Sequence, residues 1–274
     1  MYTAFEEAHN IHVNEDTGYA YVVGSPNVAS GGLHVLNLNG GTGGVMPVFA
    51  GNFSADGYTH DTQVVSYTGL DSNYVGLAIA FNSNEDTLTI VNVNDKSNMS
   101  QLSRIGYTGS EYSHQGWLSE GQQFFFMDDE LDEYRSDDPM NTRTRVWDVS
   151  DLENPVYLGF HSGEKTTIDH NLYVKGDYIF QANYTSGLRV LKINVTASVD
   201  LEEWGYFDTY GADDNVTFNG AWSVYPFFES GSILVSDRQN GLFVLSAVPE
   251  PSCLSFLGLS SLALFLRRRR GASV

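Results

Sequence analysis

Apolar residues along this chain fall into short runs that glycine, asparagine and aspartate separate. Residues 177–183 (DYIFQAN) and 186–193 (SGLRVLKI) form one such pair, and residues 232–237 (SILVSD) and 240–245 (NGLFVL) form another. Runs of this length, rich in β-branched and aromatic residues and bounded by turn formers, are typical of β-strands. Glycine is abundant at 27 residues and proline is scarce at 7, which also favours many strands joined by tight turns. The pattern predicts an all-β protein.

The strand pattern repeats about every fifty residues. Five segments align, AHNIHV, THDTQVV, SHQGWL, DHNLYV and FNGAWSV, and their leading polar residues are His9, His60, His114, His170 and Asn219. Two β-rich runs and a closing strand, such as residues 101–107 or 155–161, follow each start. Four strands per repeat predict a β-propeller of about five four-stranded blades. A β-sandwich would not need this period, and a β-helix would need shorter repeats.

Composition supports a folded and acidic body. Of 274 residues, 42% are hydrophobic and 13% aromatic, which is enough for a sizeable core. The net charge is −20, yet residues 1–247 alone carry 33 acids and 10 bases, or −23, because Arg267–Arg270 lie in the tail. Such a charge disfavours binding to nucleic acid and anionic lipid, and favours binding to cations or basic partners. The alternative is that the charge serves solubility alone. The single cysteine, Cys253, leaves the body without a disulfide.

The last 27 residues form a separate segment, so we divide the chain into a domain at 1–247 and a tail at 248–274. Pro249 and Pro251 end the preceding strand, and an uncharged apolar stretch from Ser252 to Leu266 precedes the four arginines. We expect a short hydrophobic helix there. Its fifteen residues span about 22 Å, short of a bilayer core, so insertion requires the arginines to reach the cytoplasmic interface.

This tail resembles the PEP-CTERM sorting signal of Gram-negative bacteria. The resemblance rests on Pro249, Glu250 and Pro251, the apolar stretch, and Arg267, Arg268, Arg269 and Arg270. It implies recognition by a membrane-embedded exosortase, membrane anchoring through the tail, and deployment to the cell surface or an extracellular matrix. Met1 leads directly into TAFEEAHNIHV without a signal peptide, so we expect the natural start to lie upstream.

The body resembles the choice-of-anchor B family of LVIVD-repeat propellers across residues 8–246. The runs GGLHVLNL, TLTIVNVND and TRVWDVSDLENPVYLG carry the LVIVD pattern, and FNSNEDTLTIV, YSHQGWL and FNGAWSVYP carry the family order. The family pattern has about seven repeats, which implies an N-terminally truncated seven-bladed ring as the alternative to five blades. Members carry alternative anchors, in agreement with the tail, and the resemblance implies no established activity.

The repeated histidines are the strongest candidate site. In a propeller, the first strand of each blade lines the axis, so His9, His60, His114 and His170 are expected at one mouth of the channel. The ends of the second strands return to that face, at Asn82, Asp128, Asn183 and Asp237. Imidazoles bordered by Asp128 and Asp237 could hold a transition metal. Alternatively, each histidine bonds the backbone of a neighbouring blade and has a structural role.

Two other features need weighing. Asp128–Asp138 holds seven carboxylates and could chelate Ca²⁺, although it lacks a spaced calcium-loop pattern and such runs are usually solvated. His12, His34 and His161 are expected to be packing or surface residues. No nucleophile elbow, phosphate loop or zincin helix is present.

Three functions therefore remain open. The first is an exported, non-catalytic binding module that contacts a surface protein or polysaccharide. The second is an exported metalloenzyme that uses the histidine ring. The third is a structural matrix component without a discrete ligand. The absence of catalytic motifs in the sequence favours the first.

Overall fold

The computed structural model describes residues 2–40, 46–196 and 198–247, and the strands within these ranges form five antiparallel sheets. The first sheet holds β1 (Asn10–Asn14), β2 (Tyr19–Val23), β3 (Leu33–Asn37) and β4 (Val48–Phe53). The second holds β5 (Asp61–Ser66), β6 (Ala78–Ser83), β7 (Thr87–Asn92) and β8 (Ser100–Gly106). The third holds β9 (Ser113–Leu118), β10 (Phe124–Asp129), β11 (Arg143–Asp148) and β12 (Val156–Ser162).

The remaining sheets complete the repeat. The fourth holds β13 (Asn171–Lys175), β14 (Tyr178–Ala182), β15 (Leu188–Ile193) and β16 (Leu201–Phe207). The fifth holds β17 (Ala221–Tyr225), β18 (Ser232–Asp237) and β19 (Gly241–Ser246). Helix is confined, in the described ranges, to a 3₁₀ turn η1 (Ala29–Gly31) and one α-helical turn α1 (Asp132–Arg135).

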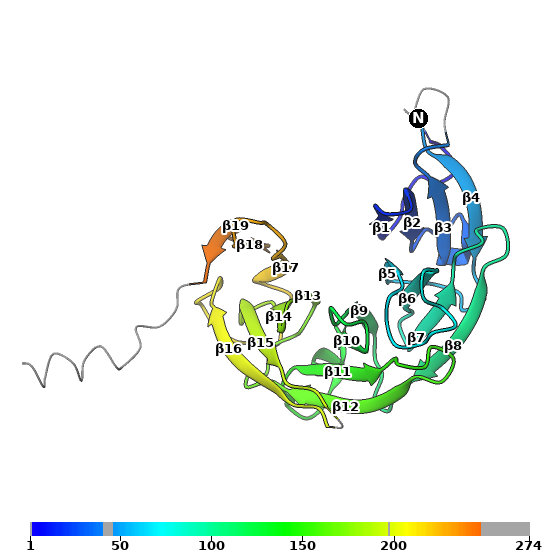
Figure 1. The fold of residues 1–274 in the computed structure, drawn as a ribbon. Helices are drawn as coiled ribbons and strands as arrows, with labels where there is room; N and C mark the ends of the chain where they lie inside the picture. The colour runs from blue at the N-terminus through cyan, green and yellow to red at the C-terminus, as the bar shows by residue number, and fades with distance from the viewer. Residues whose placement is uncertain (1, 41–45, 197, 248–274) are drawn as a thin grey trace, which may run out of the picture.

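The sheets are the blades of a β-propeller, as the repeat predicts. In Figure 1 they follow one another along an open arc, with the first strand of each blade on the inner side and the fourth on the outer side. Each first strand packs beside the next, in the order β1, β5, β9, β13 and β17. The expectation of four strands in every blade is wrong for the fifth blade, which has three in the part of the chain described here.

The expected C-terminal helix and the sorting tail, residues 248–274, lie outside the described residues. Within the described ranges, no helix has the length and apolarity needed to cross a membrane. The tail therefore stays a sequence-based prediction.

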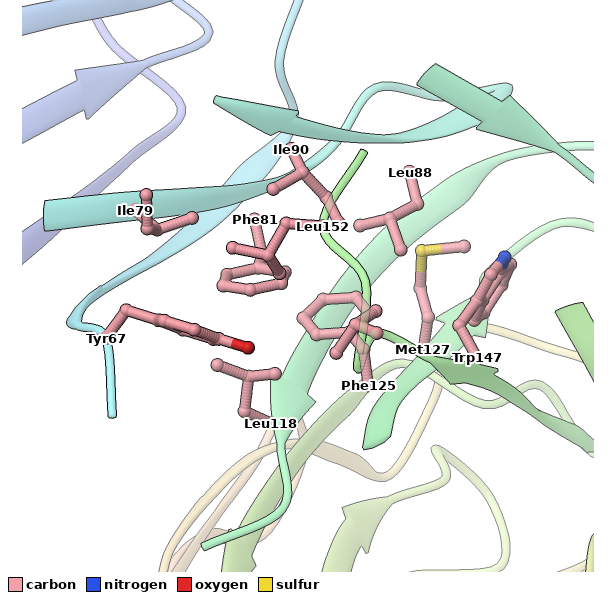
Figure 2. Close-up of a cluster of buried hydrophobic side chains, with 11 residues drawn as sticks. Tyr67, Ile79, Phe81, Leu88, Ile90, Leu118, Phe125, Met127, Trp147 and Leu152 are labelled. Carbon is pink, nitrogen blue, oxygen red and sulfur yellow. The ribbon is translucent and has the colours of Figure 1, made fainter. Parts of the chain in front are cut away.

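Hydrophobic clusters between neighbouring blades make up most of the core. Between the second and third blades, the rings of Phe81 and Phe125 stack with centroids 5.5 Å apart, and Trp147 is fully buried in the same cluster (Figure 2). Similar clusters lie at the other three blade junctions. Because both faces of an inner blade are covered, β6 and β10 are buried at every position and lack the alternation of a half-exposed strand.

One irregularity recurs in every four-stranded blade. The pairing of the third strand with the fourth shifts register between Val35 and Leu36, and equivalent shifts follow Ile90, Val146 and Val190. Such a β-bulge adds twist and bends the outer strand. Its occurrence at one position in four blades shows that the sequence repeat is also a repeat of backbone geometry.

Candidate functional site

The predicted histidines form a continuous row along the inner strands. We call His9, His60, His114 and His170 the histidine row; each lies at the start of its blade's first strand. Neighbouring ring centroids are 3.9, 4.2 and 4.2 Å apart. The four histidines lie at equivalent positions of their blades, and their rings, tilted by 42–44° to one another, follow each other along the arc instead of facing one another across a channel.

In the fifth blade Trp222 follows the histidine row, and its ring centroid lies 4.4 Å from that of His170. The sequence alignment put Asn219 in this position, and that assignment is wrong. The pairing of β17 with β18 shifts register around Trp222 as the pairing of β9 with β10 does around His114, and the carbonyl oxygen of Trp222 accepts from His170, so Trp222 is the equivalent residue of the fifth blade. The side chain of Asn219 instead accepts a hydrogen bond from Gln239 Nε2 at 2.6 Å.

Each buried histidine is tied to the backbone of the next blade. His60 Nδ1 lies 2.9 Å from the carbonyl oxygen of His114, and His114 Nδ1 lies 2.9 Å from that of His170. His170 makes the same bond to the carbonyl oxygen of Trp222. A carbonyl oxygen can only accept, so Nδ1 must donate in each ring and Nε2 keeps its lone pair. These bonds have the structural, blade-linking role that the sequence left open.

Burial holds the same rings in the neutral form. It lowers the pKa of His60 and of His170 to about 3, and lowers the pKa of His114 well below its ordinary value. The neighbouring imidazoles of the row add to the effect at His114. A neutral imidazole with a free Nε2 is the form that coordinates a metal ion.

Glu130 faces two of these free nitrogen atoms. It follows β10 directly, and its carboxylate oxygens lie 3.6 Å from His114 Nε2 and 3.6 Å from His170 Nε2. The Tyr184 hydroxyl donates to Glu130 Oε1. One ligand atom from each of His114, His170 and Glu130 lies within 4.8 Å of the others, the only such group of acids, histidines or cysteines in the described ranges.

This geometry brings three acceptors together. Both Nε2 atoms carry lone pairs, and Glu130, when ionised, only accepts, so a proton or a cation must lie between them to make the contacts favourable. Burial raises the pKa of Glu130, because the partly buried site disfavours the ionised carboxylate. Glu130 keeps 15% of its side chain exposed, whereas each histidine keeps 4%, so the group can be reached from the Glu130 side.

The other predicted ligands lie apart from this group. His9 lies beside His60, with the ring centroids 3.9 Å apart, but it is exposed and is not part of the group around Glu130. Asp128 is buried and accepts a hydrogen bond from Gln181 Nε2 at 3.2 Å. Asp237 caps the turn after β18 by accepting the backbone N–H of Gln239 and of Asn240. Glu130 was not singled out from the sequence, although it lies in the acidic run two residues after Asp128.

The remaining histidines lie within or beside blades, as expected for packing or surface residues. His12 Nε2 bonds the carbonyl oxygen of Val64 at 3.0 Å. His34 lies between Asn52, at 2.7 Å, and the Tyr2 hydroxyl, at 2.6 Å. His161 lines a small open pocket between the third and fourth blades.

The comparisons with known proteins support the architecture. No protein-family model matches the chain, and no curated protein matches it in sequence. Among solved structures, a protein from Lactobacillus plantarum is similar with a TM-score of 0.58 and 14% identity, over 89% of this chain and 72% of that one. A putative 6-phosphogluconolactonase from Bacteroides uniformis is similar with a TM-score of 0.59 and 15% identity, over 91% and 70%.

At such low identity, these structures show the fold alone. Chemical function has to be argued from the side chains of this chain. Of those, the His114–Glu130–His170 group offers the clearest chemistry, since three protein ligands leave a coordination position on the metal open to water or another ligand.

Proposed function

We propose that this protein is a propeller binding module that holds a divalent transition-metal ion between His114, His170 and Glu130. The observation that carries the proposal is the fixed tautomer of both histidines. Because each Nδ1 donates to a backbone carbonyl, each Nε2 presents its lone pair to the same carboxylate. Metal-ligating histidines are typically oriented by such a hydrogen bond from the other ring nitrogen.

The ligand set suits zinc or a neighbouring first-row metal. Zn²⁺ binds imidazole nitrogen at about 2.0–2.1 Å and carboxylate oxygen at about 2.0–2.2 Å, so tetrahedral ligands lie roughly 3.4 Å apart. The two Nε2–carboxylate distances of 3.6 Å need only a small contraction to reach that spacing. Thiolate ligands are missing from the body because the only cysteine, Cys253, lies in the tail.

The proposal includes export and display at the cell surface. Its support is the resemblance to choice-of-anchor B propellers and the PEP-CTERM-like tail from Pro249 to Arg270. On this proposal an exosortase-type enzyme recognises the tail, and the propeller contacts a surface protein or polysaccharide. The negative charge of the body is consistent with a partner other than nucleic acid.

A second candidate is a metalloenzyme at the same group. The observation that favours it is the combination of three protein ligands with access from the Glu130 side, because a catalytic zinc needs an open position for water or substrate. A structural matrix component would need no metal. Metal binding separates the third function from the other two, and metal-dependent turnover separates the enzyme from the binding module.

Metal content tests the proposal directly. The full chain is stripped with EDTA and titrated with Zn²⁺ by calorimetry, together with Glu130→Gln, which removes the charge and keeps the shape. Glu111→Gln is the matched control, since Glu111 is exposed and bonds Arg135. We expect one Zn²⁺ per wild-type or Glu111→Gln chain and an affinity at least about 100-fold weaker in Glu130→Gln. Wild-type protein that binds no metal, or Glu130→Gln that binds like wild type, would contradict the proposal.

Export has its own test. Cells expressing the propeller behind a secretory signal peptide, with or without residues 248–274, are treated with a protease. Accessibility that depends on the tail supports surface anchoring. Equal release of both forms into the medium argues against the anchor and leaves the metal site unaffected.

A further inference from the structure

Arg238 lies on the same face of the propeller as the proposed metal group. It directly follows β18, as Glu130 directly follows β10, so both residues leave the same end of corresponding strands. The backbone N–H of Arg238 donates to the carbonyl oxygen of the residue two positions before Trp222. The backbone N–H of Glu130 donates to that of the residue two positions before His114. Arg238 therefore has the place in the fifth blade that Glu130 has in the third.

Arg238 differs from the other arginines of the body because it has no acidic partner. Five of the six arginines in residues 1–247 form an ion pair with a carboxylate: Arg104, Arg135, Arg143, Arg145 and Arg189. Arg238 is exposed and forms no such pair within the described ranges. In a body that carries 33 acids and 10 bases, an exposed cation without a carboxylate is a place for an anion from solution.

The guanidinium of Arg238 is held in place and still has donors available. Its Nη1 donates to the carbonyl oxygen of Phe218, and its Cζ lies 5.4 Å from the centroid of the Trp222 ring. A guanidinium has five N–H donors, and the Arg238 side chain makes no other hydrogen bond to the residues described. Its other edge, formed by Nε and Nη2, matches the two oxygens of a carboxylate.

The charge of Arg238 reaches the metal group. Burial raises the pKa of Glu130, whereas the hydrogen bond from Tyr184 and the charge of Arg238 lower it. Burial lowers the pKa of His170 to about 3, and Arg238 adds to that effect. Trp222, which is 43% exposed, contacts both sites, since its ring centroid lies 4.4 Å from that of His170. The His170 ring and the guanidinium are therefore at most about 10 Å apart.

We propose that Arg238 selects the ligand of the metal site, and that this ligand is a sugar acid. The inference rests on the proposed metal ion. A hydroxyl group of the ligand takes the open coordination position on the metal, and the carboxylate pairs with the Nε and Nη2 edge of Arg238. The sugar ring lies against the exposed part of Trp222, because an aromatic ring offers apolar surface to its C–H groups.

A single carboxylate fits this face better than the alternatives. A phosphate ester carries up to two charges, and the field of the acidic body disfavours it more strongly. A neutral sugar leaves the donors of Arg238 unused. A carboxylate without a ring leaves Trp222 uncovered.

Calorimetry of the full chain loaded with Zn²⁺ tests the inference. D-Glucuronate is the probe, and D-glucose is its neutral counterpart. Arg238→Gln removes the charge and keeps a polar side chain. Arg135→Gln is the matched control, because Arg135 is also exposed but pairs with Glu111. The Zn²⁺ affinity of each variant is measured first, which separates loss of the metal from loss of the ligand.

We expect wild type and Arg135→Gln to bind glucuronate and not glucose. Arg238→Gln keeps its Zn²⁺ and binds glucuronate at least about 10-fold more weakly, since it loses the hydrogen bonds to a charged group. Arg238→Lys keeps the charge and loses the planar fork, so its affinity is intermediate.

Zn²⁺ binding by wild type without glucuronate binding overturns the inference and leaves the metal site in place. Equal glucuronate affinity in wild type and Arg238→Gln overturns it as well. So does loss of Zn²⁺ from Arg238→Gln, since Arg238 would then support the metal site itself. Wild-type protein that binds no Zn²⁺ contradicts the proposed function together with this inference.

Discussion

The ring of His114 donates its Nδ1–H to the carbonyl oxygen of His170 at 2.9 Å, and so joins the third blade to the fourth. The same bond sets the tautomer of His114 and turns its Nε2 toward Glu130. One contact therefore stabilises the fold and also prepares a possible ligand.

The blade-linking bond can be measured at His60, which lies outside the proposed metal group. His60→Phe keeps an aromatic ring in the row but leaves the His114 carbonyl without its donor. We expect the free energy of unfolding to fall by about 1–3 kcal/mol in urea denaturation. His9→Phe is the control, since the His9 ring stacks in the same row and is exposed. Equal effects of the two substitutions would show that stacking, and not the hydrogen bond, matters.

Tyr184 is expected to position Glu130. Its hydroxyl donates to Glu130 Oε1, so Tyr184→Phe removes the bond and keeps the ring. If the metal proposal is correct, Zn²⁺ affinity measured by calorimetry falls about 10–100-fold while one site remains. Tyr112→Phe, whose ring packs near His60 and His114, serves as control. Unchanged affinity in Tyr184→Phe would remove Tyr184 from the site.

Gly116 fills a place with no room for a side chain. A Cβ at this position would lie 2.5 Å from the ring of Phe125 and 2.5 Å from the carbonyl oxygen of Phe126. We expect Gly116→Ala to destabilise the protein by about 1–3 kcal/mol, because the stacked pair of Phe81 and Phe125 must move. Gly205→Ala in β16 has open space and should be neutral, as thermal melting can check.

Asp61 should produce a distinct pH dependence. Burial raises its pKa from 3.8 to about 7, although hydrogen bonds from Thr62 and Asn10 oppose the shift. The folded state therefore binds this proton more tightly than the unfolded state. The stabilisation that protonated Asp61 gives the folded state is complete below pH 4 and is lost as pH rises to about 7. Over that range the free energy of unfolding falls by at most about 1.4 kcal/mol per pH unit.

Comparison with Asp61→Asn isolates this effect. The buried histidines act in the opposite direction, since their lowered pKa values make acid destabilising below pH 6.5. The difference in unfolding free energy between wild type and variant should therefore be followed from pH 4 to pH 8. A difference that does not change with pH would contradict the assignment to Asp61.

The sequence predicted the blades because the repeats carry similar turn formers, and the first four carry a histidine at the start of the first strand. It missed Trp222 because the fifth repeat has no histidine at its start, and the alignment placed Asn219, three residues earlier, in that position. The residues predicted at the ends of the second strands are all buried: Asn82, Asp128, Asn183 and Asp237. Asp128 nevertheless bonds Gln181 and does not join the group formed by the histidines.

Glu130 could not be selected from the sequence because it is one of seven acids in a single run. Only folding separates them: Asp137 and Asp138 are exposed, Asp132 and Glu133 are buried, and Glu130 turns toward the row. The side chain that meets the two histidines is set by the end of β10 and by the hydroxyl of Tyr184 in the next blade. That is a long-range contact with no local signature.

The hydrophobic clusters lie between successive blades, and this arrangement makes the protein a linear series of coupled units. In such a series, an inner unit loses two interfaces when it unfolds and an end unit loses one. Amide hydrogens of β10 and β11 should accordingly exchange more slowly than those of β18 and β19. Fraying should travel inward from the last blade, and the strands that carry His114 and Glu130 should be among the last to open.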